Sequence, residues 1–311
     1  MRLATFRPAD KPNASPAAGI VVGDRIVDLA GGASALRLDP LPTTVSALIA
    51  AGPHAWDVAR ELSGRAAQTE AARRLEAAGH SRPLSDVQLL VPLALRKNVF
   101  CVGTNYAEHV AEGCRRRGEP VVLPKSAEYF TKAPTSVVGP FDPIHLDPAL
   151  SQKWDWEGEL AVVIGQQAKR VARERSMEAI FGYCCFNDVS ARDLQHRGKQ
   201  WFLGKSLDDS SPMGPWIVTA DEFGNPDDAR LITRVNGAVK QDSRTEMIFP
   251  IDLVISDLSQ GITLEPGDVI ATGTPAGVGN SAIPPQYLHP GDVLETEIVG
   301  IGAMRNRVVE A

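Results

Sequence analysis

From Val99 onward the chain consists of short apolar runs separated by glycine and proline, and this pattern limits the folds open to it. The runs predicted as strands are Val99–Val102, Glu128–Thr131, Glu159–Gly165, Gly182–Asn187, Trp216–Thr219, Leu231–Val235, Val269–Ala271, Val293–Val299 and Ala303–Val309. Helical patterns are fewer, at Tyr106–Arg117, Ser176–Ile180, Ala191–His196 and Ile251–Leu258. Many short strands with few helices favour a β-sandwich or roll over a parallel dinucleotide-binding sheet.

The first 95 residues have a different pattern. Met1–Phe6 and Gly19–Leu29 are predicted strands, the second reversing at Gly23 and Asp24. Thr43 or Thr44 can cap a helix, and a longer helical stretch covers His54–Ala78. We therefore predict a small N-terminal α/β domain over residues 1–95 and a larger domain over residues 96–311, giving an α+β chain that is mostly β.

Charge and composition exclude several classes of protein. The net charge is −6, and the only basic run, Arg115–Arg117, is interpreted as a solvated helix end, so no nucleic-acid partner is expected. No apolar run approaches the ~20 residues of a membrane span, and the N-terminus lacks a signal-peptide pattern, so a cytoplasmic protein without a membrane partner is expected. The four cysteines have no CxxC spacing, which argues against a zinc site or a disulfide framework.

Acidic residues begin and end two of the predicted strands. Glu157 and Glu159 stand two apart at the start of an apolar run, so both should face the same side of a sheet. Their repulsion would be removed by a divalent cation, and Asp188, after the apolar run Phe181–Asn187, could supply a third carboxylate. Such a set suits Mg²⁺, Mn²⁺ or Ca²⁺. The alternative is a solvated sheet edge with Asp188 as a cap, and Asp155 is expected to be a cap or an acceptor behind the site.

A histidine and a glutamate share one helical face. His109 and Glu112 are spaced i and i+3, and Asn105 is placed to cap the helix that carries them. A carboxylate on one imidazole nitrogen fixes the tautomer and makes the other nitrogen a better base. An ordinary surface ion pair is the alternative. From the residues alone, Tyr106 is expected to pack rather than to react.

Two further segments carry polar groups in unusual surroundings. Lys205 lies in an aromatic and apolar stretch, where its ammonium needs an anionic partner. That partner could be a substrate oxygen or one of the carboxylates, and both interpretations stay open. The glycine-rich loop Thr272–Gly279 could bind a carboxylate through its backbone N–H groups and the Thr274 hydroxyl, or it could be a plain tight turn.

Taken together, these segments resemble the fumarylacetoacetate hydrolase family from about Val99 to the end. The matching motifs are Gly103-x-Asn105-Tyr106-x-x-His109-x-x-Glu112, Phe130-x-Lys132, Glu157-Gly-Glu159-Leu160, Asp188 with Ala191-Arg192-Asp193-x-Gln195, Gly204-Lys205-Ser206, and Thr272-Gly273-Thr274-Pro275-x-Gly277-Val278-Gly279. No single motif is decisive, but the ordered set is specific. Residues 1–95 look like the extra domain of longer members.

The resemblance implies a mixed β-sandwich roll, a homodimer, and Mg²⁺ or Mn²⁺ (Ca²⁺ in crystals) bound by Glu157, Glu159 and Asp188. It implies a mobile lid that carries His109 and Glu112. With Lys205 these form the expected catalytic set. The expected substrate contacts are Asn105, Tyr106, Lys132, Arg192, Gln195 and Thr274.

The resemblance also implies a substrate class, the 2-oxo acids, often acylpyruvates such as fumarylpyruvate or maleylpyruvate from aromatic catabolism. We expect a hydrolase in which His109, polarised by Glu112, activates a water that cleaves a C–C bond. The same site could serve an oxaloacetate-type decarboxylase, or a 2-hydroxymuconate isomerase or hydratase. A metal-bound binding protein is the alternative without catalysis.

Overall fold

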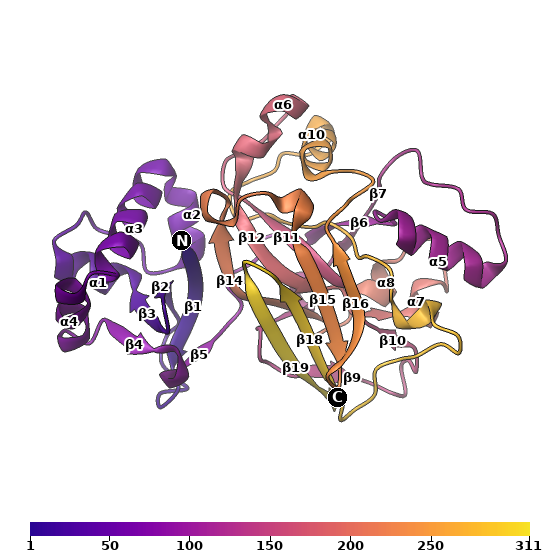
Figure 1. The fold of residues 1–311 in the computed structure, drawn as a ribbon, viewed down its shortest axis with the longest axis horizontal. Helices are drawn as coiled ribbons and strands as arrows, with labels where there is room; N and C mark the ends of the chain where they lie inside the picture. The colour runs from indigo at the N-terminus through magenta and orange to yellow at the C-terminus, as the bar shows by residue number, and fades with distance from the viewer.

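The computed structural model describes residues 1–311 and arranges their strands in three sheets, of twelve, five and two strands (Figure 1). The strands are β1 (Arg2–Pro8), β2 (Ala17–Val22), β3 (Arg25–Asp28), β4 (Ser81–Pro83), β5 (Val87–Leu89), β6 (Val99–Gly103), β7 (Glu128–Lys132), β8 (Val137–Val138), β9 (Ile144–Leu146), β10 (Trp154–Asp155), β11 (Gly158–Ile164), β12 (Ile180–Asn187), β13 (Ser190–Ala191), β14 (Ser211–Thr219), β15 (Arg230–Val235), β16 (Ala238–Arg244), β17 (Val269–Ala271), β18 (Val293–Ile298) and β19 (Gly302–Glu310). The α-helices are α1 (Leu29–Leu36), α2 (Val45–Ala51), α3 (Pro53–Ala66), α4 (Thr69–Ala77), α5 (Ala107–Arg117), α6 (Arg173–Ser176), α7 (Arg192–Gln195), α8 (Phe202–Lys205), α9 (Ala220–Phe223) and α10 (Ile251–Gly261).

Two antiparallel strands at the centre of the large sheet position the acidic residues. Every residue of β11 and β12 is buried, which fits their nearly continuous apolar sequences. Gly158 pairs with Asn187 at one end of the ladder and Val163 with Gly182 near the other. This register sets the residues just before and after Gly158 beside the residue that follows Asn187. Strand pairing therefore brings Glu157 and Glu159 close to Asp188, although about 30 residues separate them in the sequence.

The five-stranded sheet, in the order β16-β15-β18-β19-β9, lies against the large sheet and closes the roll. The predicted fold class, a mostly β sandwich roll with some helices, is confirmed. One of its edge strands, β16, was absent from the sequence prediction because its residues are mostly polar and half or fully exposed. Pairing with β15 at Ile232↔Asp242, rather than burial, defines that strand.

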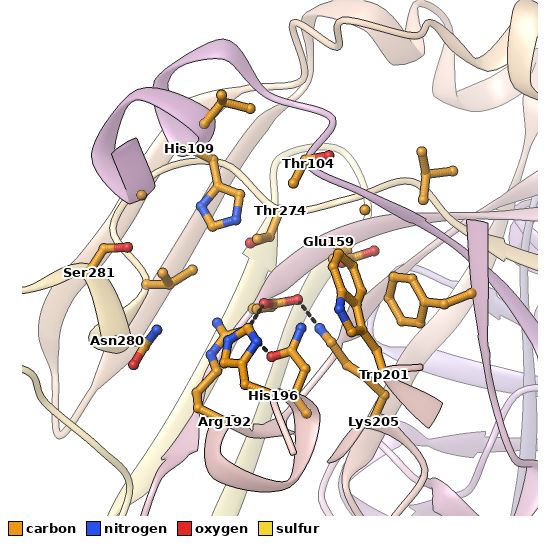
Figure 2. A pocket seen from close by; sticks show the side chains of 18 of the residues that line it. Thr104, His109, Glu159, Arg192, His196, Trp201, Lys205, Thr274, Asn280 and Ser281 are labelled. Carbon is orange, nitrogen blue, oxygen red and sulfur yellow. Dashed lines mark hydrogen bonds and ion pairs between the residues drawn. The ribbon is translucent and has the colours of Figure 1, made fainter. Parts of the chain in front are cut away.

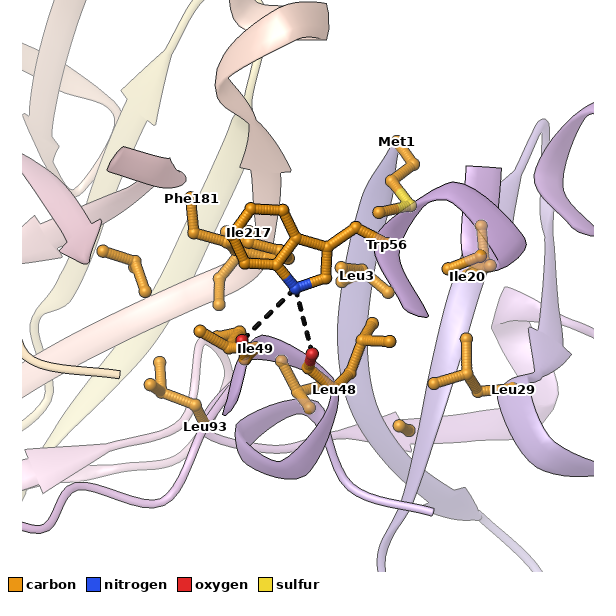
Figure 3. Close-up of a cluster of buried hydrophobic side chains, with 14 of the residues drawn as sticks. Met1, Leu3, Ile20, Leu29, Leu48, Ile49, Trp56, Leu93, Phe181 and Ile217 are labelled. Carbon is orange, nitrogen blue, oxygen red and sulfur yellow. Dashed lines mark hydrogen bonds between the residues drawn. The ribbon is translucent and has the colours of Figure 1, made fainter. Parts of the chain in front are cut away.

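The N-terminal residues are joined to the rest by both a sheet and a core. Strand β1 pairs with β14 at Arg2↔Val218 and Leu3↔Ile217, so one sheet runs through both parts of the chain (Figure 1). Trp56 on α3 packs edge-on against Phe181 of β12, with ring centroids 5.1 Å apart (Figure 3). The domain boundary at residue 95 stays a prediction, but core and sheet are continuous across it.

Of the predictions for single helices, the cap of α2 is confirmed and the single long helix that follows it is wrong. Thr44 caps α2, accepting a hydrogen bond from Ala47 N at 3.2 Å. The helix expected over His54–Ala78 is instead two helices, α3 and α4. The four cysteines are buried and free. None of the helices has both the length and the apolar character needed to cross a bilayer.

Trp56 provides a test of this continuity. Replacing Trp56 with Ala should lower the free energy of unfolding by about 3–5 kcal/mol, because it empties a site filled from both parts of the chain. Trp56→Phe keeps an aromatic ring but loses the Nε1 hydrogen bonds to Leu48 O and Ile49 O, at 3.0 and 3.3 Å, and should cost less. Urea unfolding measures both. A loss below about 1 kcal/mol for Trp56→Ala would show that the junction adds little.

Candidate active site

Three carboxylates meet where β11 begins and β12 ends. Glu157, Glu159 and Asp188 each offer an oxygen, and these oxygens all lie within 4.8 Å of one another. All three residues are buried. The backbone N–H of Asp188 donates to Glu157 O at 2.8 Å, which continues the strand pairing beyond the ladder. The sequence prediction that these residues come together is therefore confirmed, and the carboxylates must be balanced by cations in their immediate surroundings.

Two buried cations neutralise Glu157. Lys205 Nζ lies 2.7 Å from Glu157 Oε2, and Arg192 Nη1 lies 2.6 Å from Glu157 Oε1. Burial alone would raise the pKa of the Glu157 carboxyl, but Lys205 and Arg192 hold it well below its usual range. Glu157 is therefore charged at neutral pH.

Asp188 is neutralised in the same way, again through both oxygens. Lys205 Nζ is 2.7 Å from Asp188 Oδ2, and the fully buried Lys132 Nζ is 2.6 Å from Asp188 Oδ1. Lys205 thus bridges two of the three carboxylates, which confirms the salt-bridge interpretation of this residue. Its predicted catalytic role stays a prediction.

Glu159 differs from its two neighbours because no cation pairs with it. The only hydrogen bond to the Glu159 carboxylate comes from the backbone N–H of Gly273, at 2.9 Å from Oε2. Burial, followed by the nearby charges of Asp188 and Glu157, raises the pKa of the Glu159 carboxyl well above its ordinary value. One of three clustered carboxylates is therefore left without a counter-charge.

The His–Glu pair lies on α5, above these carboxylates. His109 Nδ1 is 2.8 Å from Glu112 Oε1, and the other Glu112 oxygen accepts from Gly277 N at 2.9 Å. A carboxylate only accepts hydrogen bonds, so we assign the ring proton to Nδ1, which leaves Nε2 free as a base. Figure 2 shows the imidazole pointing from the helix into the pocket.

A pocket of about 200 Å³ lies between His109 and the carboxylates. Of the site residues predicted from sequence, those that line it are His109, Glu157, Glu159, Arg192, Gln195, Lys205 and Thr274. Those that lie outside its lining are Asn105, Tyr106, Glu112, Lys132 and Asp188. Arg192 Nη1 donates to Gln195 Oε1 at 3.0 Å, so these two neighbours form one polar wall.

Comparison with known proteins identifies the family of this chain. A family model described as the fumarylacetoacetate (FAA) hydrolase C-terminal domain matches residues 98–309. The chain belongs to the fumarylacetoacetate hydrolase family. It is 38% identical to oxaloacetate tautomerase YisK of Bacillus subtilis over 294 residues, covering 93% of this chain and 95% of that protein. The chain is therefore an enzyme of this family.

Two solved structures extend the comparison over the full length. One is a fumarylacetoacetate hydrolase from the psychrophile Exiguobacterium antarcticum, 37% identical, with a TM-score of 0.78 and full coverage of both chains. The other is a maleylpyruvate hydrolase from Sphingobium sp. SYK-6, 28% identical, with a TM-score of 0.75 and full coverage of both chains. Enzymes named for tautomerisation and for hydrolysis thus both resemble this chain.

Asn105 belongs to the motif that carries the family resemblance, and its side chain is bound inside the fold. It was expected to cap α5, but the helix begins at Ala107 and Tyr106 is its N-cap residue. The Asn105 amide instead donates to Phe249 O at 3.1 Å and Thr272 O at 2.8 Å, and it accepts from Phe249 N at 2.7 Å. These bonds tie the segment before α5 to two distant segments, a role that local spacing could not reveal. Tyr106 is buried, with a hydroxyl that has no hydrogen-bond partner.

The glycine-rich loop binds carboxylates, but they are the chain's own. Gly273 N donates to Glu159 and Gly277 N to Glu112, each at 2.9 Å. Gly277 has φ +102°, and a Cβ there would lie 2.1 Å from a backbone oxygen, so only glycine fits. The Thr274 hydroxyl donates to Gly158 O at 2.9 Å, so its predicted substrate contact stays a prediction.

Several residues that shape the site were not singled out from sequence. Trp201 lines the pocket and packs edge-on against Phe130, with ring centroids 5.3 Å apart. Lys205 Nζ lies 5.0 Å from the centroid of the Phe130 ring, so this aromatic pair shields the ammonium from water. His196 and Asn280 also line the pocket. Only the aromatic character of the stretch before Lys205 could have pointed to Trp201.

The donor set fits a divalent cation. The ligand atoms are carboxylate oxygens, which hard cations prefer, and Glu159 lacks the counter-charge that such an ion would supply. Counting Asp155, which pairs with Arg192 Nη2 at 2.7 Å, four buried carboxylates face three buried cations. A divalent ion would therefore leave the cluster positive enough to receive an anionic substrate.

The unequal partners of Glu157 and Glu159 predict opposite effects from the same substitution. Without metal, Glu159→Gln should leave the free energy of unfolding unchanged or raised, because it removes a buried carboxyl whose charged form no cation stabilises. Glu157→Gln should lower it by about 3–5 kcal/mol, because Lys205 and Arg192 lose a buried partner.

Both variants should lose the stabilisation that Mn²⁺ gives the wild type. Urea unfolding in EDTA, followed by thermal unfolding with and without Mn²⁺, measures the two effects. Glu178→Gln, an exposed substitution, is the matched control and should change neither. Equal destabilisation by the two site variants in EDTA would contradict this account of the charges.

Proposed function

We propose that this chain is a divalent-metal-dependent enzyme that interconverts the keto and enol forms of a short 2-oxo acid of the oxaloacetate class. The observation that carries the proposal is a polarised imidazole, His109 with Glu112, facing a carboxylate triad across a small pocket. Proton transfer next to a carbonyl needs a base on one side and a charge-stabilising group on the other.

The size of the pocket and the named relative support this choice. At about 200 Å³ the pocket is smaller than the roughly 300–1,000 Å³ typical of drug-sized ligands, which favours a substrate of few atoms. The similarity to a protein named oxaloacetate tautomerase runs through nearly the whole chain. The pocket volume and the named relative thus both support a short 2-oxo acid as the substrate.

In the proposed reaction Glu157, Glu159 and Asp188 would hold Mg²⁺ or Mn²⁺. When bound, this ion would supply Lewis acidity that stabilises negative charge on the oxygens of the 2-oxo acid. His109 Nε2 accepts a proton from C3 of the keto acid, and the electron pair of that C–H bond moves toward the C2 oxygen. Return of the proton to that oxygen gives the enol. Glu112 keeps the second nitrogen of His109 protonated throughout.

The cations around the pocket would orient the substrate. Lys205 lies beside two of the three carboxylates, so it could hold a substrate oxygen close to the ion. Arg192 and Gln195 lie side by side on the pocket wall, where their remaining donors could bind the substrate carboxylate. Lys205, Arg192 and Gln195 would thus hold the carboxylate end of the substrate while His109 takes the proton from C3.

Hydrolysis of an acylpyruvate is a second candidate, because the same His–Glu pair could deprotonate a water instead of a carbon. It is favoured by the similarity to a maleylpyruvate hydrolase along the full chain. The decarboxylase and the 2-hydroxymuconate isomerase or hydratase would use the same groups. Assembly as a homodimer and a cytoplasmic location stay predictions.

Metal removal tests the proposed function. The absorbance of enol oxaloacetate should decay faster with the enzyme and Mg²⁺ than in protein-free buffer with Mg²⁺. EDTA should abolish the difference, and Mg²⁺ or Mn²⁺ should restore it, because the triad alone cannot stabilise the negative charge of the reaction. Release of pyruvate and CO₂ would instead identify a decarboxylase. Two acids formed from an acylpyruvate, with no effect on oxaloacetate, would replace this proposal with the hydrolase.

The role of His109 predicts a loss of turnover without a loss of metal binding. His109→Ala should lower kcat by about 10²–10⁴, the usual contribution of a general base, while the thermal shift with Mn²⁺ stays intact. His145→Gln is the matched control, since His145 is also paired with a carboxylate, Asp209 at 2.8 Å, but does not line this pocket. An unchanged kcat in His109→Ala would remove this residue from the mechanism.

A further inference from the structure

A second cavity of about 430 Å³ adjoins the pocket, and no apolar side chain lines it. The two hollows share part of their walls, including Arg117, Arg192 and His196. Figure 2 shows Arg192 and His196 at the lower side of the pocket, with Asn280 to their left, and all three line both cavities. A molecule bound at the carboxylate triad could therefore extend past these residues into the second cavity.

Positive charge gathers around this second cavity. Its lining includes Arg116, Arg117, Lys153 and Arg192, against one carboxylate, Asp193. The Asp193 carboxylate already accepts from Ser151 Oγ at 2.6 Å. In a chain with a net charge of −6, such a cluster is an exception to the overall balance. Burial and then the charges of Arg192, Lys205, Arg116 and Arg117 lower the pKa of His196, which shows the sign of the local potential.

Arg117 and Lys153 retain free bonding capacity, and Arg116 donates only to Asn280 O through Nη1. Lys153 forms no salt bridge, although its backbone is held by Ser151 and Arg192. Arg117 Nε donates to Glu119 Oε2 at 2.7 Å, while Arg117 Nη1 donates no hydrogen bond within the chain. Arg192, by contrast, directs most of its donors to buried carboxylates and to Gln195. The capacity to bind an anion therefore lies mainly with Lys153, just before β10, and with Arg117, the last residue of the basic run that the sequence analysis interprets as a solvated helix end.

We propose that this second cavity is a subsite for the distal carboxylate of the substrate, read by Arg117 and Lys153 with His196 between them and the pocket. This inference rests on the proposed function, in which the triad holds the 2-oxo acid end. It makes the enzyme selective for 2-oxo acids with two carboxylates. Arg117 is the specificity-determining residue, because it lines both cavities.

The test compares two stable ligands that share a five-carbon chain, 2-oxoglutarate and 2-oxopentanoate, which differ only in a carboxylate or a methyl group at the far end. Oxalate serves as a probe of the metal end alone. Calorimetry of the full chain in Mg²⁺ should show tighter binding of 2-oxoglutarate than of 2-oxopentanoate by about tenfold, as expected for a charge-assisted hydrogen bond. Binding does not depend on turnover, so this result is independent of the reaction assigned above.

Arg117→Gln and Lys153→Gln should each reduce this preference without changing the affinity for oxalate. Arg115→Gln is the matched control, since Arg115 lies on the same helix but lines neither cavity, and its guanidinium pairs with Glu108 at 3.9 Å. Equal affinity of the wild type for the two acids, or a preference unchanged in both variants, would overturn the subsite and leave the proposed function standing. Absence of binding by all three ligands would overturn both.

Discussion

The constraint on which this structure depends is the burial of three mutually repelling carboxylates at one point of the central sheet. Glu157, Glu159 and Asp188 have almost no contact with solvent, so their charge must be balanced from inside the protein. Lys132 and Lys205 are buried for this reason, and each lies within 2.7 Å of a carboxylate oxygen. The balance is incomplete at Glu159, which makes the site receptive to a cation and, through it, to an anionic substrate.

Strand register converts this electrostatic requirement into geometry. The β11–β12 ladder holds the three acidic residues together, and every residue of both strands is buried. The N-terminal residues add to this rigidity through β1 and Trp56, which pack against the same sheet far from the pocket. A rigid sheet below and a helix above give a base and a charge-stabilising centre that face each other.

The sequence predicts those features that rest on local periodicity. Alternation along a strand was enough to bring Glu157 and Glu159 together, and helical spacing was enough to pair His109 with Glu112. Partners supplied by distant segments were not predictable. Local sequence could not show whether Lys205 pairs with a substrate or with a carboxylate, because its partners Asp188 and Glu157 lie 17 and 48 positions away. Asparagine is a residue type that favours helix caps, yet the Asn105 side chain forms hydrogen bonds with segments more than 140 positions along the chain.

The glycine-rich loop holds two active groups at once. Gly273 orients Glu159 and Gly277 orients Glu112, so the carboxylate triad and the proposed base depend on one short stretch of backbone. Trp156 Nε1 fixes the same loop from below through Gly277 O, at 3.0 Å. A chimera that borrows the helix of a relative would therefore need the matching loop as well, and exchange of either part alone would misalign the imidazole with the triad. In this chain, α5 and the glycine-rich loop therefore form one structural unit.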